Sequence, residues 1–174
     1  MNSIICWILQ TEIGRRIEMQ VLMHLVTYSL QLPKRNLLLM SSGQALDDFA
    51  SFTAKHLESC DDGGRQVLSA GAYRLGKRLR LFLTDRSKEA LSRMTFLLYR
   101  NIGIDMEGQL PGKVIVRKCH FCRYYSPRIC RIASLMDAGV ICGLFGGGSL
   151  VFTERITEGK TNCMCELCKE SESK

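Results

Sequence analysis

Seven of the nine cysteines in this 174-residue chain fall within its last third. They are Cys119, Cys122, Cys130, Cys142, Cys163, Cys165 and Cys168. Cysteine thiolates bind zinc and iron–sulfur clusters, and paired thiols also carry out redox chemistry. In a reducing compartment such a cluster indicates metal binding or redox chemistry rather than a disulfide framework.

Cys119 and Cys122 form a Cys-x-x-Cys pair. Two intervening residues let both sulfurs reach one tetrahedral ion, at about 2.3 Å from each thiolate. A thioredoxin-like redox pair would open a helix after a βαβ strand, and the pattern around this pair contains no such unit. Metal binding is therefore the preferred interpretation, with a redox dithiol and plain structural thiols as alternatives.

Cys130 and Cys142 lie on one predicted helix, which begins at Pro127. Cys130 is in its first turn, where the partial positive charge of the helix end favours a thiolate, so it is the third predicted ligand. Cys142 is twelve residues further along the helix. At about 1.5 Å per residue this is roughly 18 Å, too far to share one ion, so we expect Cys142 in the core.

The last predicted strand supplies the fourth ligand. Cys163 and Cys165 are two residues apart, so both side chains point to one face, and Cys168 follows the strand end. His120 is a weaker candidate, because it adjoins Cys119 on an extended segment and would point the other way. A four-thiolate zinc site is the preferred model, and an iron–sulfur cluster is its rival, because four cysteines suit both. The preferred ligands are Cys119, Cys122, Cys130 and Cys163, with Cys165 and Cys168 as alternatives to the last.

The elements that must position these thiols follow from hydrophobic periodicity and turn residues. The predicted helices span residues 13–32, 41–57, 65–83, 87–99 and 127–144, and the predicted strands span 104–107, 114–116, 150–156 and 161–167. The strands form two hairpins, the first of which ends at Cys119. Segregated helices and hairpin-connected strands indicate an α+β fold: N-terminal helices followed by a four-stranded antiparallel sheet, with a helix between its two hairpins.

Three local patterns add detail to this picture. Ser41 and Gln44 have the spacing of a capping box, which predicts a helix start at Ser41. Gly71 and Gly76 lie inside the third predicted helix, where each costs about 1 kcal/mol relative to alanine, so they indicate close packing against another element. The glycines at 146–148 follow a helix and precede a strand, the reverse of the order in a phosphate-binding loop.

Length and pattern predict one main domain with a segment at either end. We expect an N-terminal helical extension at 1–40, a ligand-binding domain at 41–168 and a polar tail at 169–174. The extension is also a candidate dimerisation arm, and a homodimer is expected.

The formal net charge of +7 suits an anionic partner. Basic residues along two predicted helices are typical of a solvated helix face; a nucleic-acid surface is the alternative, and no DNA-reading unit accompanies it. The sequence has neither an export signal nor the roughly 18 apolar residues of a membrane span, so we expect a soluble cytoplasmic protein. It also lacks a nucleophile elbow, a Walker loop and a spaced carboxylate pair, so catalysis is not favoured.

An ordered set of short motifs extends over residues 43–168. The set comprises Gly71-Ala-Tyr-Arg-Leu-Gly76-Lys-Arg-Leu, Gly103, a hairpin that ends in Cys119, Ile129-Cys130, Gly139-Val-Ile-Cys-Gly143, Val151-Phe-Thr-Glu154 and Gly159-x-x-x-Cys163. In order and spacing it resembles the 4-vinyl reductase-like domain, also known as the predicted hydrocarbon-binding domain. The resemblance implies an α+β fold related to haem-based nitric-oxide sensors and Golgi transport-particle subunits, and the binding of a small hydrophobic molecule.

The resemblance also implies a zinc site formed by a cysteine at a helix start, a glutamate and two cysteines of the last hairpin. Cys130, Glu154 and Cys163 match three of these positions, and Thr157 stands where the family has its fourth ligand. Cys119 and Cys122 are the natural replacements, which agrees with the four-thiolate set above. Glu154 thereby joins the less favoured candidates.

These features predict a metal-stapled binding or sensor module whose apolar interior accepts a small hydrophobic ligand. In this interpretation the metal holds the hairpin ends to the helix that begins at Pro127 and contributes to folding stability. The main alternative is a redox or iron–sulfur protein, or an accessory enzyme for a vinyl-bearing tetrapyrrole. A third interpretation is an adaptor that works through protein contacts.

Overall fold

The computed structural model describes residues 11–168, so the first ten residues of the predicted extension and the predicted polar tail at 169–174 lie outside it. The helices are α2 (Glu12–Ser29), α3 (Ser42–Leu57), α4 (Asp62–Leu81), α5 (Lys88–Asn101) and α6 (Pro127–Phe145). The strands are β1 (Ile104–Gly108), β2 (Gly112–Cys119), β3 (Ser149–Glu154) and β4 (Cys163–Cys168), and two short 3-10 helices are η1 (His120–Arg123) and η2 (Ile156–Glu158). This architecture confirms the predicted α+β class.

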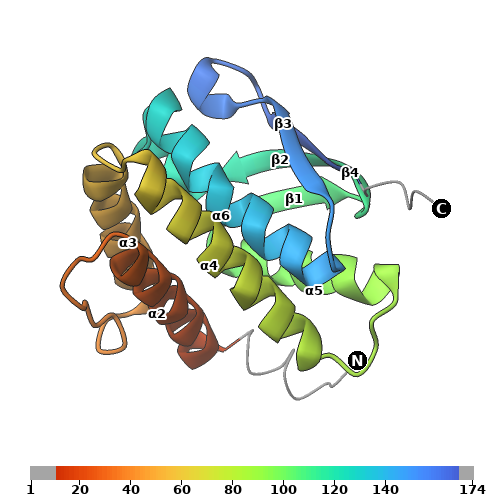
Figure 1. Ribbon diagram of the computed structural model, residues 1–174, viewed down its shortest axis with the longest axis horizontal. Helices are drawn as coiled ribbons and strands as arrows, with labels where there is room; N and C mark the ends of the chain where they lie inside the picture. Colours follow the sequence, from red (N-terminus) through yellow and green to blue (C-terminus); the bar gives the residue numbers. More distant parts are fainter. Residues whose placement is uncertain (1–10, 169–174) are drawn as a thin grey trace.

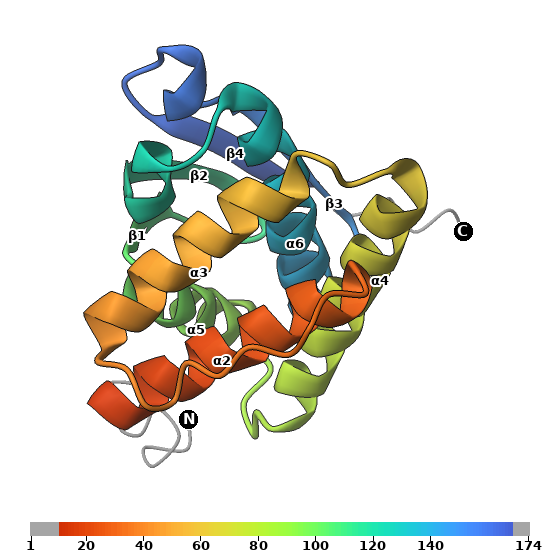
Figure 2. The same ribbon diagram turned by 90° about the vertical axis from the view of Figure 1, so that its left-hand side faces the viewer.

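The four strands form one antiparallel sheet in the order β1-β2-β4-β3. The two hairpins meet where β2 pairs with β4, which places Val116 opposite Cys163 and Val114 opposite Cys165. Helix α6, which connects the hairpins, lies along the sheet, and Figure 1 shows α4 beside it. The side view in Figure 2 shows α6 between the sheet and α4. The end of β2 and the start of α6 therefore approach the start of β4.

Side-chain caps define the helix starts, and the cap at Ser41 is the one that the sequence predicts. Ser41 Oγ accepts from the backbone N–H of Gln44, and the Gln44 side chain accepts from the Ser41 N–H at 3.1 Å, which confirms the capping box. The Ser126 side chain accepts from the backbone N–H of Ile129 at the start of α6, with Pro127 at the first helical position. These local bonds satisfy backbone donors that a helix start would otherwise leave unpaired.

The predicted start of the third helix at residue 65 is wrong by three residues. Asp61 Oδ1 accepts from the Gly64 backbone N–H at 2.7 Å, and α4 begins at Asp62. Gly63 and Gly64 therefore belong to the first turn of α4 and do not separate it from α3. An aspartate N-cap outweighs the low helix propensity of the two glycines that follow it.

The predicted close packing at Gly76 is confirmed by the crossing of α4 and α6. A Cβ atom on Gly143 of α6 would lie 2.2 Å from the Tyr73 carbonyl oxygen of α4, so the backbones of the two helices are in direct contact. Gly71 is tight as well, since a Cβ atom there would lie 2.6 Å from Leu25 Cδ1 of α2. Small residues at these positions bring three helices into direct contact.

Helix α2 shares the hydrophobic core of the remaining elements. Met19, Met23 and Val26 are buried in the same cluster as the apolar residues of α3 to α6. The link that follows is irregular, and its Leu37 side chain is fully buried. The helix predicted as part of an extension is thus packed onto the body of the protein.

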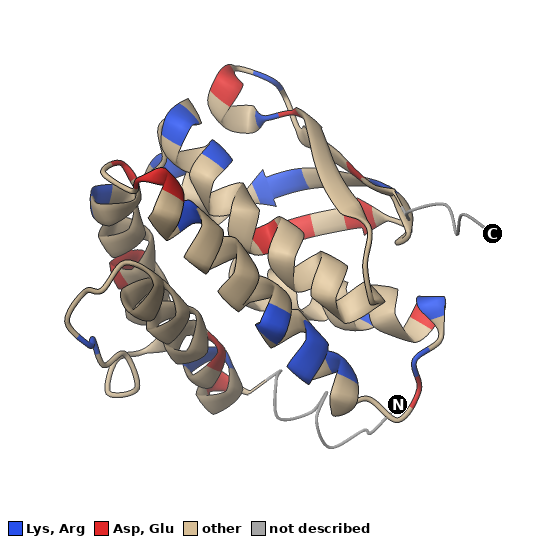
Figure 3. Cartoon of the chain, viewed as in Figure 1, with Lys and Arg blue, Asp and Glu red and all other residues tan. Residues whose placement is uncertain are grey.

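No helix within residues 11–168 is both long enough and apolar enough to cross a bilayer. Basic residues are concentrated toward the C-terminal end of α4, as the colouring of the chain in Figure 3 shows. Lys77 and Arg78 are exposed there, and Arg80 donates to the Leu144 carbonyl oxygen at 3.2 Å. The predicted solvated basic face and its nucleic-acid alternative both stay predictions.

Candidate functional site

A cavity of about 240 Å³ lies between the helices and the sheet. Its lining is mostly apolar and comes from every principal helix and strand, for example from Ile17, Leu75, Leu98, Met106, Val116 and Met136. Ile17 and Val21 of α2 line it while remaining 47% and 42% exposed, so the cavity reaches the surface beside α2. An apolar cavity of about 150 Å³ admits benzene, so this one has room for a larger molecule.

A carboxyl group and a phenol form a polar pair on the cavity wall. The Tyr99 hydroxyl of α5 donates to Asp137 Oδ1 of α6 at 3.0 Å. Burial raises the pKa of Asp137 to about 6, and the bond from Tyr99 and the positive charge of Arg155 partly offset that shift. Burial also raises the pKa of Tyr99, and the Asp137 charge adds to that effect. The pair therefore brings a titratable group into an apolar space.

A second carboxyl group, Glu18 of α2, lines the cavity near its opening. Burial raises the pKa of Glu18 to about 8, although Asn101 Nδ2 donates to its Oε2 atom at 3.0 Å and lowers it. At neutral pH Glu18 is therefore mostly protonated. It adds a polar group to this wall without adding a full charge.

Sequence reasoning missed Glu18, Tyr99, Asp137 and Arg155. One signal was present for Asp137, which is the only charged residue in the stretch 132–145. A charged residue in an otherwise apolar helical segment is often a functional group, because its burial needs a specific partner. Arg155 carried no comparable signal, since it lies near the end of the predicted strand 150–156, next to Glu154.

The predicted thiol cluster is at one end of the same cavity. Cys119, Cys130, Cys163 and Cys165 all line it. Cys122 is in η1, directly beside Cys119, whose thiol donates a hydrogen bond to the Cys122 sulfur. That bond lowers the pKa of Cys122 to about 7 and is the main reason why the pKa of Cys119 is raised. The Cys-x-x-Cys pair thus contains one thiol that ionises easily.

Cys130 and Cys163 face this pair from α6 and β4. Burial raises the pKa of both thiols, and the charges of Cys122 and Cys130 act on Cys163. Thr157 partly offsets the rise in the pKa of Cys130, and its hydroxyl oxygen is buried without a hydrogen-bond partner among residues 11–168. The fold therefore brings the four preferred cysteines into one neighbourhood.

The less favoured candidates are distributed differently. Cys165 points into the cavity, whereas Cys168 is exposed at the opposite end of β4 from Cys163, roughly 17 Å away at about 3.4 Å per residue. Glu154 is the half-buried last residue of β3. Its neighbour across the sheet is Met164.

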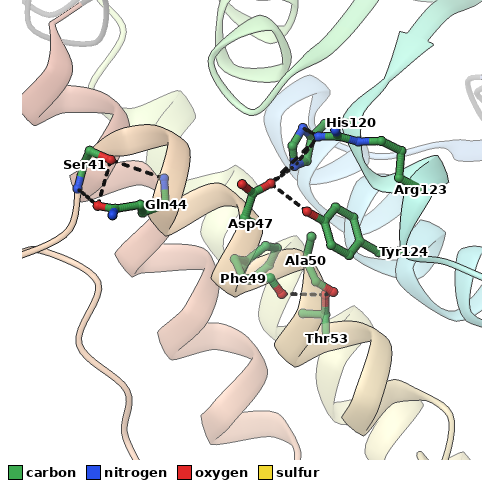
Figure 4. Close-up of polar contacts among 9 residues, drawn as sticks. All are labelled: Ser41, Gln44, Asp47, Phe49, Ala50, Thr53, His120, Arg123 and Tyr124. Atoms are coloured by element: carbon green, nitrogen blue, oxygen red, sulfur yellow. Dashed lines mark hydrogen bonds and ion pairs between the residues drawn. The ribbon is translucent and has the colours of Figure 1, made fainter.

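His120 is directed toward α3 and not toward the thiols. Its Nε2 atom lies 3.0 Å from Asp47 Oδ1, and the Tyr124 hydroxyl donates to the same oxygen at 2.7 Å. Figure 4 shows Asp47 meeting His120, Arg123 and Tyr124 in this way. Burial lowers the pKa of His120, with Arg123 acting in the same direction and Asp47 opposing it. His120 thus helps to join η1 to α3.

Backbone N–H groups are directed at two of the sulfurs. The backbone N–H of Ile156 donates to Cys163 Sγ at 3.3 Å, and that of Phe121 donates to the Cys119 sulfur. Such bonds favour the thiolate form that zinc requires. Within residues 11–168, however, no three side chains of the ligand types converge on a point where one ion would bind. The structure therefore shows the donors as neighbours and not as a closed coordination set.

Comparisons were made with models of known protein families, with curated proteins and with solved structures. No family model, no curated protein and no solved structure matches this chain. The resemblance to the 4-vinyl reductase-like domain therefore stays a prediction. The site itself is an apolar cavity with a few polar groups on its wall and a thiol cluster at one end.

Proposed function

We propose that this protein binds a small hydrophobic molecule in the cavity between α6, the sheet and α2, and acts as a binding or sensor module. The cavity is the single observation that supports this most, because its wall is mostly apolar with only a few polar groups. Ligand sites of small molecules have this composition, since apolar area supplies affinity and a few polar groups supply orientation.

The way the cavity is built supports a sensing role. Its wall includes α2 at the opening and the starts of α6 and β4 at the thiol end. A ligand that contacts all of these elements stabilises their packed arrangement, and the stabilisation grows with the logarithm of its affinity for the folded state. Binding would therefore be detected as a change in the stability of the packing between α2, α6 and β4.

A structural metal is the second part of the proposal. Cys119, Cys122, Cys130 and Cys163 would hold zinc, which supplies four strong bonds between η1, α6 and β4 and so contributes to folding stability. The positive charge of Arg155, which acts on Cys130 and Cys163, would offset the excess negative charge of four thiolates. An iron–sulfur cluster in the same residues is the alternative.

The binding proposal is tested with naphthalene, a neutral apolar probe, by fluorescence and by the thermal midpoint of unfolding. Ala133→Leu adds side-chain volume on the cavity wall and is expected to lower naphthalene affinity at least about 10-fold, since it occupies the space of the probe. Ala70→Leu is the matched control, because Ala70 is exposed on the outer face of α4. Absence of binding, or equal affinities in both variants, would contradict the proposal.

A redox function is the second candidate, and the Cys119–Cys122 pair favours it. The Cys119 thiol lowers the pKa of its partner Cys122 to about 7, as in dithiols that cycle through a disulfide. An accessory role in tetrapyrrole chemistry belongs to the same class. A visible spectrum with broad absorbance that dithionite bleaches would favour the cluster version, and a colourless zinc protein would remove it.

The predicted homodimer, the adaptor role and the cytoplasmic location stay predictions. Sedimentation of the purified protein with and without naphthalene tests the first two together. A ligand-independent dimer is the expected result for an adaptor, whereas a sensor is expected to change its assembly or its stability when the probe is added.

A further inference from the structure

The guanidinium group of Arg155 is a mostly buried cation on the cavity wall. Its side chain is 14% exposed, and its Cζ atom lies 4.4 Å from the centre of the Phe152 ring. Its Nη1 atom is buried and has no hydrogen-bond partner among residues 11–168. A buried charged donor without an acceptor is costly, so a partner from outside the chain would be strongly favoured.

The nearby carboxylates are already engaged elsewhere. Glu158 Oε1 lies 3.9 Å from Arg155 Nε but only 2.8 Å from both Nε and Nη2 of Arg131. Asp137 Oδ1 accepts from Tyr99, and no ion pair in the described part of the chain joins Asp137 to Arg155. Nη1 of Arg155 therefore has no acceptor among these carboxylates, because Glu158 and Asp137 bind other side chains.

The geometry points to a ligand that supplies this missing acceptor. We propose that the bound molecule is a small hydrophobic compound with one acceptor oxygen, a carboxylate or a carbonyl, that receives a hydrogen bond from Arg155 Nη1. Its apolar body then fills the space toward α2, between Leu98, Met106 and Met136. This inference rests on the proposed function, since it concerns the chemistry of the molecule in the same cavity. A carboxylate is the stronger acceptor, because both partners of the bond are then charged.

Three matched probes test the proposal on the full chain. They are naphthalene, 2-acetylnaphthalene and 2-naphthoate, which share one apolar body and differ in the acceptor. We expect at least one oxygen-bearing probe to bind about 10-fold or more tightly than naphthalene, as a hydrogen bond to a charged donor requires. Arg155→Met is expected to abolish this gain, so that the three probes bind the variant with similar affinities. Arg131→Met is the matched control, because Arg131 also contacts Glu158 but is exposed and does not line the cavity.

The outcomes separate this inference from the proposed function. If naphthalene does not bind, the cavity proposal fails, and this inference fails with it. If naphthalene binds but neither oxygen-bearing probe gains affinity, or if the gain survives Arg155→Met, only the role of Arg155 is overturned. A gain for 2-naphthoate alone identifies an acid as the ligand class, whereas similar gains for both identify the carbonyl oxygen.

Two further measurements guard against a purely structural effect. If Arg155→Met does not fold, Arg155→Lys replaces it; lysine keeps the charge but lacks the planar fork, so the gain should fall for 2-acetylnaphthalene more than for 2-naphthoate. Unchanged affinities in Arg155→Lys would overturn the proposal. Metal content is measured in every variant, and an equal loss of all three probes together with metal would show that Arg155 serves the thiol cluster instead.

Discussion

A Cβ atom on Gly76 of α4 would lie 2.1 Å from the backbone carbonyl oxygen of Val140 in α6. Val140 also lines the cavity, as do Leu75 and Leu79 on either side of Gly76 in α4. The same two helices therefore contribute both to the packing of the core and to the cavity wall. Small residues at the crossing are a requirement of the fold and of the site together.

Gly76→Ala is expected to destabilise the protein by about 1–3 kcal/mol, even though alanine is the better helix former. The clash is with backbone atoms, which cannot move aside as a flexible side chain can. Chemical denaturation measures the change. Gly43→Ala is the matched control, because a Cβ atom there meets nothing within 4 Å, and it should be neutral or slightly stabilising. Equal effects in the two variants would contradict the close crossing.

The partly buried carboxyl group of Glu18 should make stability depend on pH. Its pKa is about 8 in the folded protein and near 4.5 when exposed, so between these values the folded state holds a proton that the unfolded state has lost. Stability should therefore fall as pH rises from about 4.5 to 8, by at most about 1.4 kcal/mol per pH unit. Asp137, whose pKa is raised to about 6, adds a slope of the same sign over the lower part of that window.

Glu18→Gln tests this pH dependence while keeping an acceptor for Asn101. Urea unfolding at pH 5, 6.5 and 8 is expected to show a clearly flatter profile for the variant than for the wild-type protein. Glu12→Gln is the control, because Glu12 is exposed on the same helix. A steep fall that persists in Glu18→Gln would show that another group is responsible.

Metal analysis of anaerobically purified protein is expected to find about one zinc per chain, and a chelator is expected to lower the thermal midpoint. Cys130→Ser and Cys163→Ser should each reduce metal content by more than half, because each removes one of four ligands. Cys168→Ser should keep it, because Cys168 is exposed at the far end of β4. Less than about 0.2 metal per chain, with stability indifferent to chelator, would rule out the structural metal.

In the metal-free, reduced protein the Cys122 thiol should react with iodoacetamide with a half-point near pH 7, because the Cys119 thiol donates a hydrogen bond to it. Cys119→Ala removes that donor and should raise the pKa of Cys122 toward the ordinary value, which slows alkylation at pH 7 several-fold. Mass spectrometry of the peptide that contains Cys122 follows the rate. Cys168→Ala leaves the pair intact, so a similar slowing in that variant would argue against the bond.

Local features of this protein were predictable because their causes lie within one or two turns of chain. The capping box at Ser41 and the helix start at Pro127 depend on neighbours three residues away, and both predictions are confirmed. The predicted start of α4 at residue 65 is wrong, and the cause is again a local one. Asp61 caps the helix across Gly63 and Gly64, and glycine by itself indicates an end.

The thiol cluster was only partly predictable. Strand alternation places Cys163 and Cys165 on one face, and helix rise separates Cys142 from Cys130, both of which follow from local geometry. That Cys119 and Cys122 would stand beside Cys130 and Cys163 depends on how β2 pairs with β4 and where α6 crosses the sheet. The four-thiolate metal site itself stays a prediction.

The sequence by itself determined the α+β class, the concentration of thiols in the last third and the tight contacts at Gly76. Only the tertiary structure decided that Asp137 of α6 and Arg155 after β3 share a cavity with Glu18 of α2 and with the thiols. The physical reason is that a cavity is the space left where side chains from separate elements fail to meet. No local periodicity, cap or spacing records such a space, because it exists only after the helices have packed on the sheet.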